Sequence, residues 1–188
     1  MNETIHQLME RKSVRVFEDK PIGSREKEAI LNAAFAAPTA GNQQLYTILE
    51  ITDQELKLKL SESCDHQPFI ATGKLVLVFC ADCRKWYNAF VAAGSAPRHP
   101  GAGDLLLAVS DANIAAQNAV TAAESLGIGS CYIGDIIENC DVQREILGLP
   151  EYVKPVCMAV FGVPTQQQRE RKKPVRFELE DVVHENAY

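Results

Sequence analysis

The longest helical pattern in the chain does most to limit what it can fold into. It runs over residues 104–126, is rich in Ala, and carries no charged side chain between Asp111 and Glu124. A helix without a charged face has to be covered on most of its surface. Gly127 then provides a typical C-terminal stop. The pattern therefore predicts a long helix that lies in the core or against a second copy of the chain.

Apolar runs with β character alternate with helical patterns along the rest of the chain. Residues 75–81 and 155–163 are uninterrupted apolar segments, the pattern of buried strands, and shorter strands are expected at 45–51 and within 127–136. Further helices are expected over residues 5–9, from Ser24 as the N-cap to just before Pro38, and over 57–62 and 142–147. The alternation indicates a mixed α and β domain in which helices cover a central sheet.

The 188 residues, 46% hydrophobic and 23% charged, are typical of one globular domain. Residues 84–103 are the least regular part of it. Aromatic side chains at Trp86, Tyr87 and Phe90 are followed by several Gly and Pro residues. We expect this segment to be mobile.

Several function classes lack their motifs. No apolar leader and no run long enough to cross a bilayer is visible, so a cytoplasmic protein is expected. The six Cys include one C-x-x-C pair, Cys80 and Cys83, but Cys80 falls inside an expected strand, and we interpret both as reduced packing residues. Motifs for a Rossmann site, a P-loop, a zinc protease and a serine hydrolase are missing, and no metal site or catalytic acid–base residue is predicted.

The positive charge is concentrated in two places, although the net charge is -6. The N-terminal basic segment, residues 11–15, holds three cations, and the C-terminal basic segment, residues 169–176, holds five against one acid. If Arg11, Ser13 and Arg15 alternate to one side of an extended stretch, they converge on one point and suit a phosphate. The alternatives are a solvated basic loop and a disordered basic tail. An acidic chain with two such segments favours a small anion over nucleic acid.

Four segments, in order along the chain, resemble the FMN-dependent nitroreductase family, and especially its NADPH-nitroreductase and flavin-reductase subgroup. They are Arg11-Lys12-Ser13-Val14-Arg15-Val16-Phe17, Pro38-Thr39-Ala40-Gly41-Asn42-Gln43-Gln44, the stretch from Ala115 to Gly134, and Val183-His184-Glu185-Asn186-Ala187-Tyr188.

The resemblance implies a three-layer α+β sandwich, with a central, mainly antiparallel sheet flanked by helices. It implies an obligate homodimer with FMN at the interface. The implied activity is NAD(P)H oxidation by a ping-pong mechanism, in which flavin N5 takes a hydride from NADH or NADPH and passes it to a nitroaromatic, a quinone or a free flavin. A non-catalytic flavin-binding protein, or a family member that performs dehalogenation or flavin fragmentation, remains an alternative. No partner that is a nucleic acid or a membrane is implied.

The resemblance also assigns cofactor-binding residues, counted by their positions here. Arg11, Ser13 and Arg15 match residues at the flavin phosphate and pyrimidine edge, and the loop from Thr39 to Asn42 matches one offered by the other subunit. Residues 84–103 become a candidate lid, and the tail 165–188 completes the site. In the tail, Val175 interrupts the family pattern, so either Lys172 or Lys173 could reach the phosphate. Larger members of the subgroup continue beyond the segment that ends here at Tyr188. The resemblance therefore does not indicate whether NADH or NADPH is the reductant. The full predicted set is Arg11, Lys12, Ser13, Val14, Arg15, Pro38, Thr39, Ala40, Asn42, Gln67, Tyr132, Ile133, Gly134, Lys173 and Arg176.

Overall fold

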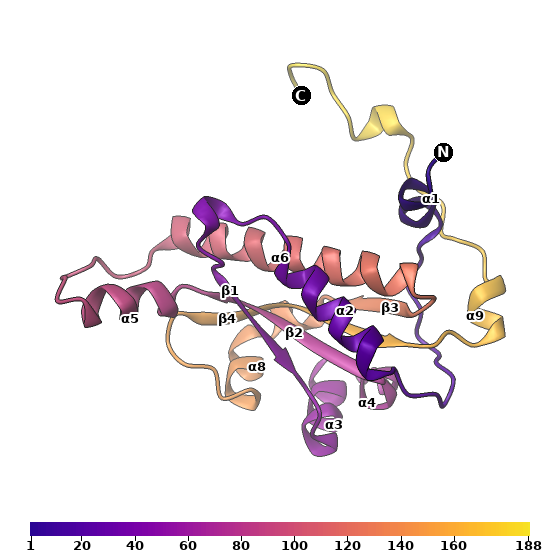
Figure 1. The fold of residues 1–188 in the computed structure, drawn as a ribbon, viewed down its shortest axis with the longest axis horizontal. Helices are drawn as coiled ribbons and strands as arrows, with labels where there is room; N and C mark the ends of the chain where they lie inside the picture. The colour runs from indigo at the N-terminus through magenta and orange to yellow at the C-terminus, as the bar shows by residue number, and fades with distance from the viewer.

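A computed structural model describes all 188 residues (Figure 1). Its centre is one four-stranded sheet in the order β1-β2-β4-β3, in which every neighbouring pair of strands is antiparallel. Every residue of β2 is buried; burial of residues 75–81 was predicted from their uninterrupted apolar sequence, and the strand also includes Asp82. The strands are β1 (Tyr46–Glu50), β2 (Leu75–Asp82), β3 (Gly129–Ile133) and β4 (Val153–Gly162).

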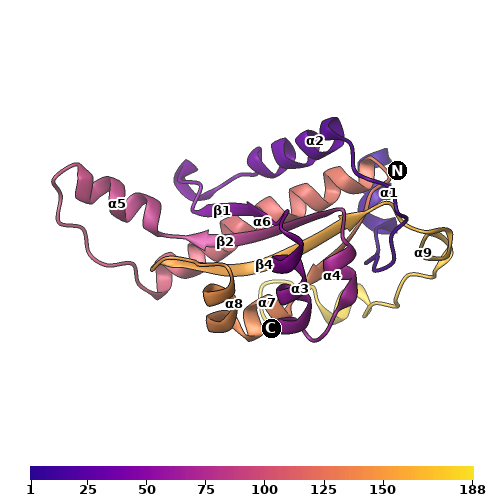
Figure 2. The same cartoon turned by 90° about the horizontal axis from the view of Figure 1, so that it is seen from below.

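Helices cover both faces of this sheet, which confirms the three-layer α+β architecture. Helices α2 (Ser24–Phe35) and α6 (Ala102–Ser125) pack on one face and share a core cluster with β2 and β4. A second core cluster lies on the opposite face, against the shorter helices (Figure 2). These are α3 (Gln54–Ser63), α4 (Pro68–Thr72), α7 (Asp135–Glu138) and α8 (Cys140–Ile146).

The long helix α6 is buried on one side only. Its Ala side chains at 108, 112, 115, 116, 119 and 123 are fully buried against the sheet and α2. The opposite side is exposed and uncharged. We call this side the neutral face of α6, and it consists of Leu106, Leu107, Ser110, Asn113, Ile114 and Gln117. The sequence predicted that this helix would be covered on most sides. Within one chain, only the side that faces the sheet is covered.

Two sequence predictions need correction. Residues 84–103 are not irregular throughout, because α5 (Arg84–Ala92) is a regular helix that begins directly after β2, and only the Gly- and Pro-containing part beyond it lacks regular structure. Ser24 is not the N-cap of α2: Gly23 takes that position with extended backbone, and Ser24 is the first helical residue. Short helices such as α4, α7 and α9 (Gln166–Glu170) have too few residues to show a helical period in the sequence.

The N-terminal basic segment crosses the edge of the sheet in extended conformation. Ser13 forms a parallel bridge with Ser130 of β3, and the Val14 amide donates to the Ser130 carbonyl at 2.8 Å. Two glycines make the close approach possible. A Cβ on Gly129 would lie 2.7 Å from the Val14 side chain, and one on Gly162 would lie 2.5 Å from the Phe17 ring. Without these glycines the segment could not lie against the sheet.

Both ends of the chain leave apolar side chains uncovered. Helix α1 (Glu3–Glu10) has no buried residue, and the C-terminal arm, residues 174–188, is exposed throughout and contains the short 3-10 helix η2 (Leu179–Asp181). In Figure 1 the arm extends away from the sheet, past α1. None of the helices combines the length and the apolar character needed to cross a membrane.

Candidate functional site

The two basic segments lie against each other. The Lys12 ammonium donates to the carbonyl of Arg169 at 2.6 Å and to that of Arg171 at 2.5 Å. In return, the Arg171 guanidinium donates to the Ser13 carbonyl, and the Lys173 ammonium donates to the Met9 carbonyl. The two basic segments therefore lie together, an arrangement consistent with a tail that completes the site, as the resemblance implies.

Arg11 is the most unusual residue of this group. Its Nε and Nη2 atoms are buried, yet neither has a hydrogen-bond partner. The guanidinium carbon lies 5.8 Å from the centre of the Tyr132 ring, a cation–π distance. A buried charged donor without an acceptor is costly, so such a group points to an acceptor that a ligand would supply.

The positive charges around β3 act on the pKa of two ionisable groups. Burial raises the pKa of the Cys131 thiol, while the positive charge of Arg15 acts in the opposite direction. Burial also raises the pKa of Glu124, which lies at the end of α6, and here Arg11 and Lys12 oppose the rise. The start of β3 and the end of α6 therefore share one positive environment.

At the far end of β3, Gly134 borders open space. A Cβ on this residue would meet no atom within 4 Å. Gln67 lies beside this point, because its side-chain amide donates to the Asp135 carboxylate at 2.9 Å. Arg15 and the first residues of α4, which follow Gln67, line a shallow cavity of about 410 Å³. Arg15 and α4 therefore line the same cavity. Gln67 lies at the end of β3 beside Gly134, and Tyr132 and Ile133 are the last two residues of that strand.

The loop of residues 38–44 is held by one buried carboxylate. Asp111 of α6 is only 2% exposed and accepts from the Ala40 amide at 2.9 Å and from the Leu45 amide at 3.2 Å. Within the loop, Gly41, Asn42 and Gln44 all have positive φ, between 49° and 56°. Asp111 was not among the predicted site residues. Its signal in the sequence is an acid at the start of the uncharged stretch of the long helix, which ends at Glu124.

One chain does not bring this loop to the basic segments. The loop is attached to α6 at Asp111, whereas Lys12 shares a cavity with Glu124 near the other end of the helix. At 1.5 Å per residue, these two points are about 20 Å apart along the axis. Of the predicted tail residues, Lys173 contacts the N-terminal region, while Arg176 is exposed in the arm, with no hydrogen bond or ion pair to the domain.

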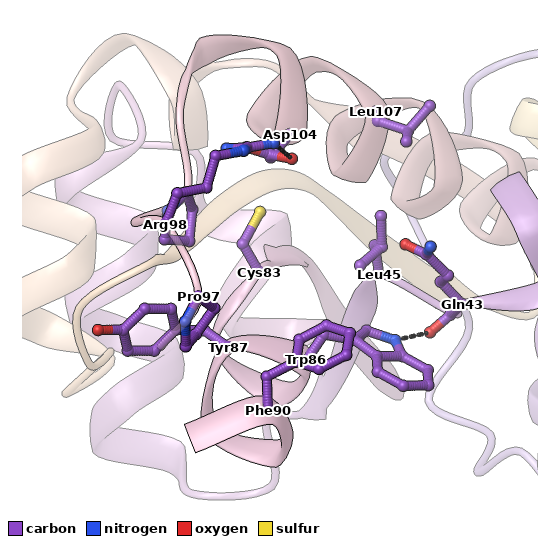
Figure 3. A pocket seen from close by; sticks show the side chains of 11 residues that line it. Gln43, Leu45, Cys83, Trp86, Tyr87, Phe90, Pro97, Arg98, Asp104 and Leu107 are labelled. Carbon is purple, nitrogen blue, oxygen red and sulfur yellow. Dashed lines mark hydrogen bonds and ion pairs between the residues drawn. The ribbon is translucent and has the colours of Figure 1, made fainter. Parts of the chain in front are cut away.

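A second cavity, of about 240 Å³, lies between α5 and the first turns of α6 (Figure 3). Trp86 and Phe90 form one wall, with ring centres 5.9 Å apart, and Leu107 lies on the opposite side. The Trp86 indole donates to the Gln43 carbonyl at 2.7 Å, which connects this cavity to the loop of residues 38–44. The two nitrogens Nη1 and Nη2 of Arg98 pair with the Asp104 carboxylate at 2.5 and 2.8 Å.

The six Cys residues are all free, and all but Cys140 are buried. Burial raises the pKa of Cys80 to about 12, and that of Cys83 is also raised. A thiol becomes a nucleophile only after it loses its proton, so these two are unreactive at neutral pH. This supports their interpretation as packing residues rather than a redox pair.

The fold and the site define a three-layer α+β domain in which cations from both ends of the chain gather at the edge of the sheet. A sequence model described as the Nitroreductase family matches residues 8–163. The chain belongs to this family, as the four sequence segments predicted.

Similar proteins cover the whole chain. It is 35% identical over 190 residues to FMN reductase [NAD(P)H] of Bacillus subtilis (strain 168), and 37% identical over 188 residues to oxygen-insensitive NADPH nitroreductase of Salmonella typhimurium. Each match spans 100% of this chain and 75% of the relative. Among solved structures, NADPH:FMN oxidoreductase from Vibrio harveyi complexed with NAD+ superimposes with a TM-score of 0.91 at 30% identity, covering 100% of this chain and 78% of that one.

Proposed function

We propose that this chain is an FMN-dependent NAD(P)H oxidoreductase. The observation that carries the proposal is the half-buried Arg11 side chain, whose buried Nε and Nη2 atoms have no hydrogen-bond partner. The phosphate and the carbonyl oxygens of FMN are acceptors of the kind these donors need. When bound, FMN supplies the redox chemistry, since it accepts a hydride from NADH or NADPH and delivers it to an acceptor. The relatives named above, an FMN reductase and an NADPH nitroreductase, carry out reactions of this class.

The residues of the chain bind and orient the cofactor. Arg11, Ser13 and Arg15 neutralise and hold its anionic and carbonyl groups, with Lys173 or Lys172 and Arg176 contributing from the tail. The main chain at Ile133 and Gly134 would face the ring, since the space beside Gly134 is open. A fixed positive charge near the ring favours the reduced, more negative form of a flavin. We assign no acid or base to the reaction, so the contribution of the protein is binding and electrostatics.

The proposed assembly is a homodimer with FMN at the interface. Each chain holds the loop of residues 38–44 about 20 Å along α6 from its own basic segments, so the loop of a second chain completes the site. The neutral face of α6 supplies an uncharged surface for this contact. Helix α1 and the C-terminal arm add exposed apolar side chains that a second copy would cover. NAD(P)H is available in the cytoplasm, and we place the protein there.

Spectroscopy tests the proposed function. The purified protein should bind FMN tightly, and anaerobic addition of NADPH or NADH should bleach the visible absorbance of the bound flavin. Replacing Arg11 by Met, which keeps an unbranched apolar stem but removes the charge and the donors, should weaken FMN binding at least about tenfold, since hydrogen bonds to charged groups contribute about 1.5–3 kcal/mol. The matched control is Arg25→Met, an exposed cation on α2.

The outcomes separate the alternatives. A protein that binds no FMN refutes the proposal entirely. A protein that binds FMN but is not reduced by either nicotinamide is a flavin-binding protein without this activity. Equal FMN affinity in Arg11→Met and Arg25→Met would remove Arg11 from the site.

A further inference from the structure

We propose that Asp135 is a positioning residue for the flavin ring, because it fixes the side-chain amide of Gln67 so that the amide offers a ligand only its oxygen. The group that would donate to this oxygen is the single N–H of the flavin pyrimidine ring, at N3. The inference rests on the proposed function and goes beyond it, since that proposal gives no role to Asp135 and no direction to the Gln67 amide.

The direction of the Gln67 amide follows from its two partners. Its NH2 group donates to the Cys64 carbonyl and to the Asp135 carboxylate, both at 2.9 Å. A carbonyl and a carboxylate accept hydrogen bonds and donate none, so the nitrogen of the amide, rather than its oxygen, has to face them. Both hydrogens of the NH2 group are then used. The side chain of Gln67 therefore has only its oxygen, Oε1, left to offer a ligand.

The turn that carries Gln67 has a strained backbone. Asp65 and His66, the two residues before it, have φ values of 58° and 51°, in the left-handed region that residues with side chains disfavour. The main chain of Gln67 is tied to Ser61 twice: its amide donates to the Ser61 carbonyl at 3.0 Å, and its carbonyl accepts from the Ser61 hydroxyl at 2.8 Å. Strain of this kind persists only where the surrounding structure imposes it, and it is concentrated at sites that hold ligands.

Buried groups support this turn from behind. Gln143 of α8 is fully buried, and its side-chain amide donates to the Ser63 carbonyl at 3.3 Å. Helix α4 begins directly after Gln67 and contributes two buried residues to the second core cluster. Burial raises the pKa of the Cys64 thiol to about 11, and the negative charge of Asp135 adds to this rise, which shows how close Asp135 lies to the turn. The Gln67 side chain is therefore held on a rigid support.

The pair lies where the proposed flavin ring would present its pyrimidine edge. Asp135 directly follows Gly134, beside which the space is open. On the pyrimidine edge of a flavin, two carbonyls flank one N–H, at N3. The carbonyls are acceptors, so N3–H is the only group on this edge that can pair with the oxygen of Gln67. Turning the amide around would place Oε1 against the Asp135 carboxylate, another acceptor, and Asp135 therefore keeps the oxygen directed at the ligand.

The test compares FMN with N3-methyl-FMN, in which a methyl group replaces the N3 hydrogen. Both flavins are titrated into FMN-free protein, and the affinity ratio is the Kd for N3-methyl-FMN divided by the Kd for FMN. We expect an affinity ratio of at least about 10 for the parent protein, because the methyl group removes the hydrogen bond and overlaps Oε1. Gln67→Ala removes the acceptor and makes room for the methyl group, so its affinity ratio should lie within about threefold of 1.

Variants of Asp135 test its positioning role. Asp135→Ala frees the amide of Gln67 to turn, and its affinity ratio should fall at least about threefold below that of the parent. Asp135→Asn retains an oxygen that can accept from the NH2 group of Gln67, so it should stay within about twofold of the parent ratio. The control is Glu138→Ala, which removes an exposed carboxylate from the same helix, α7, and should leave the affinity ratio unchanged.

Anaerobic bleaching of the bound FMN by NADPH and by NADH is recorded for the parent protein, so that the two proposals can fail separately. A parent protein that binds no FMN, or whose bound FMN is bleached by neither nicotinamide, refutes the proposed function. Normal FMN binding and bleaching, with an affinity ratio near 1 in the parent, overturns the pairing of Gln67 with N3–H. A parent ratio that persists in Asp135→Ala, or that is lost in Asp135→Asn, overturns the positioning role of Asp135.

Discussion

Replacing Asp111 by Ala should destabilise the protein by about 2–6 kcal/mol. The carboxylate is buried and accepts from the amides of Ala40 and Leu45 at 2.9 and 3.2 Å. Its removal leaves the buried Leu45 amide and the part-buried Ala40 amide without an acceptor, and a buried donor in that state costs about 1–3 kcal/mol, so the full range is an upper estimate. Asp111→Asn keeps one acceptor oxygen but directs an NH2 group toward the second donor, so about half of this loss is expected.

Urea unfolding, followed by far-UV circular dichroism at a fixed protein concentration, measures this difference. The control is Glu28→Ala, which removes an exposed carboxylate from α2 and should change the stability by no more than about 0.5 kcal/mol. Hydrogen exchange should show the amides of Ala40 and Leu45 losing protection before the strands do. If Asp111→Ala costs less than about 1 kcal/mol, or no more than Glu28→Ala, the carboxylate does not hold the loop in the way described.

Three further predictions follow from the packing and the thiols. Gly134→Val should weaken FMN binding at least about tenfold, because the new side chain occupies space proposed for the flavin. The urea unfolding midpoint should not change, because this side chain meets no atom of the chain itself. Equal FMN affinity in the variant would show that the flavin does not lie beside this residue. Gly162→Ala should cost about 1–3 kcal/mol, because its methyl group would overlap the Phe17 ring, and an unchanged urea midpoint would contradict this packing. In the native protein at pH 8, a thiol reagent should react rapidly with Cys140 only. Cys80 should react only as the pH approaches about 12, because its thiol keeps its proton below that pH. Rapid labelling of Cys80 at pH 8 would favour a redox role for the C-x-x-C pair.

The elements predicted well from the sequence are those whose pattern is uniform. Residues 75–81 of β2 and 155–162 of β4 are uninterrupted apolar runs because both faces of the sheet are covered, and α6 is long enough to show its period. Helix α5 was missed because the Gly and Pro residues that follow it made the whole region look irregular. The short helices α4 and α7 complete barely one turn, so no periodicity exists to detect.

The candidate site was predictable in its charges and only partly in its contacts. Clustered cations at residues 11–15 and 169–176 indicated an anion site. The contacts that join them run from side chains to main-chain carbonyls, such as Lys12 to Arg169 and Arg171. Any residue supplies a carbonyl, so no sequence pattern marks these partners. The sequence could not predict the exposed position of Arg176 either, because this position depends on the direction in which the arm leaves the domain.

The 20 Å that separate Asp111 from Glu124 along α6 have a genetic consequence. In the proposed dimer, each FMN site takes its cations from one chain and its loop from the other. A chain altered at Arg11 and a chain altered at Asp111 are each defective in both sites when they pair with themselves. When the two kinds of chain pair with each other, both defects fall in one site and the other site is intact. Two inactive alleles would then complement each other within one cell.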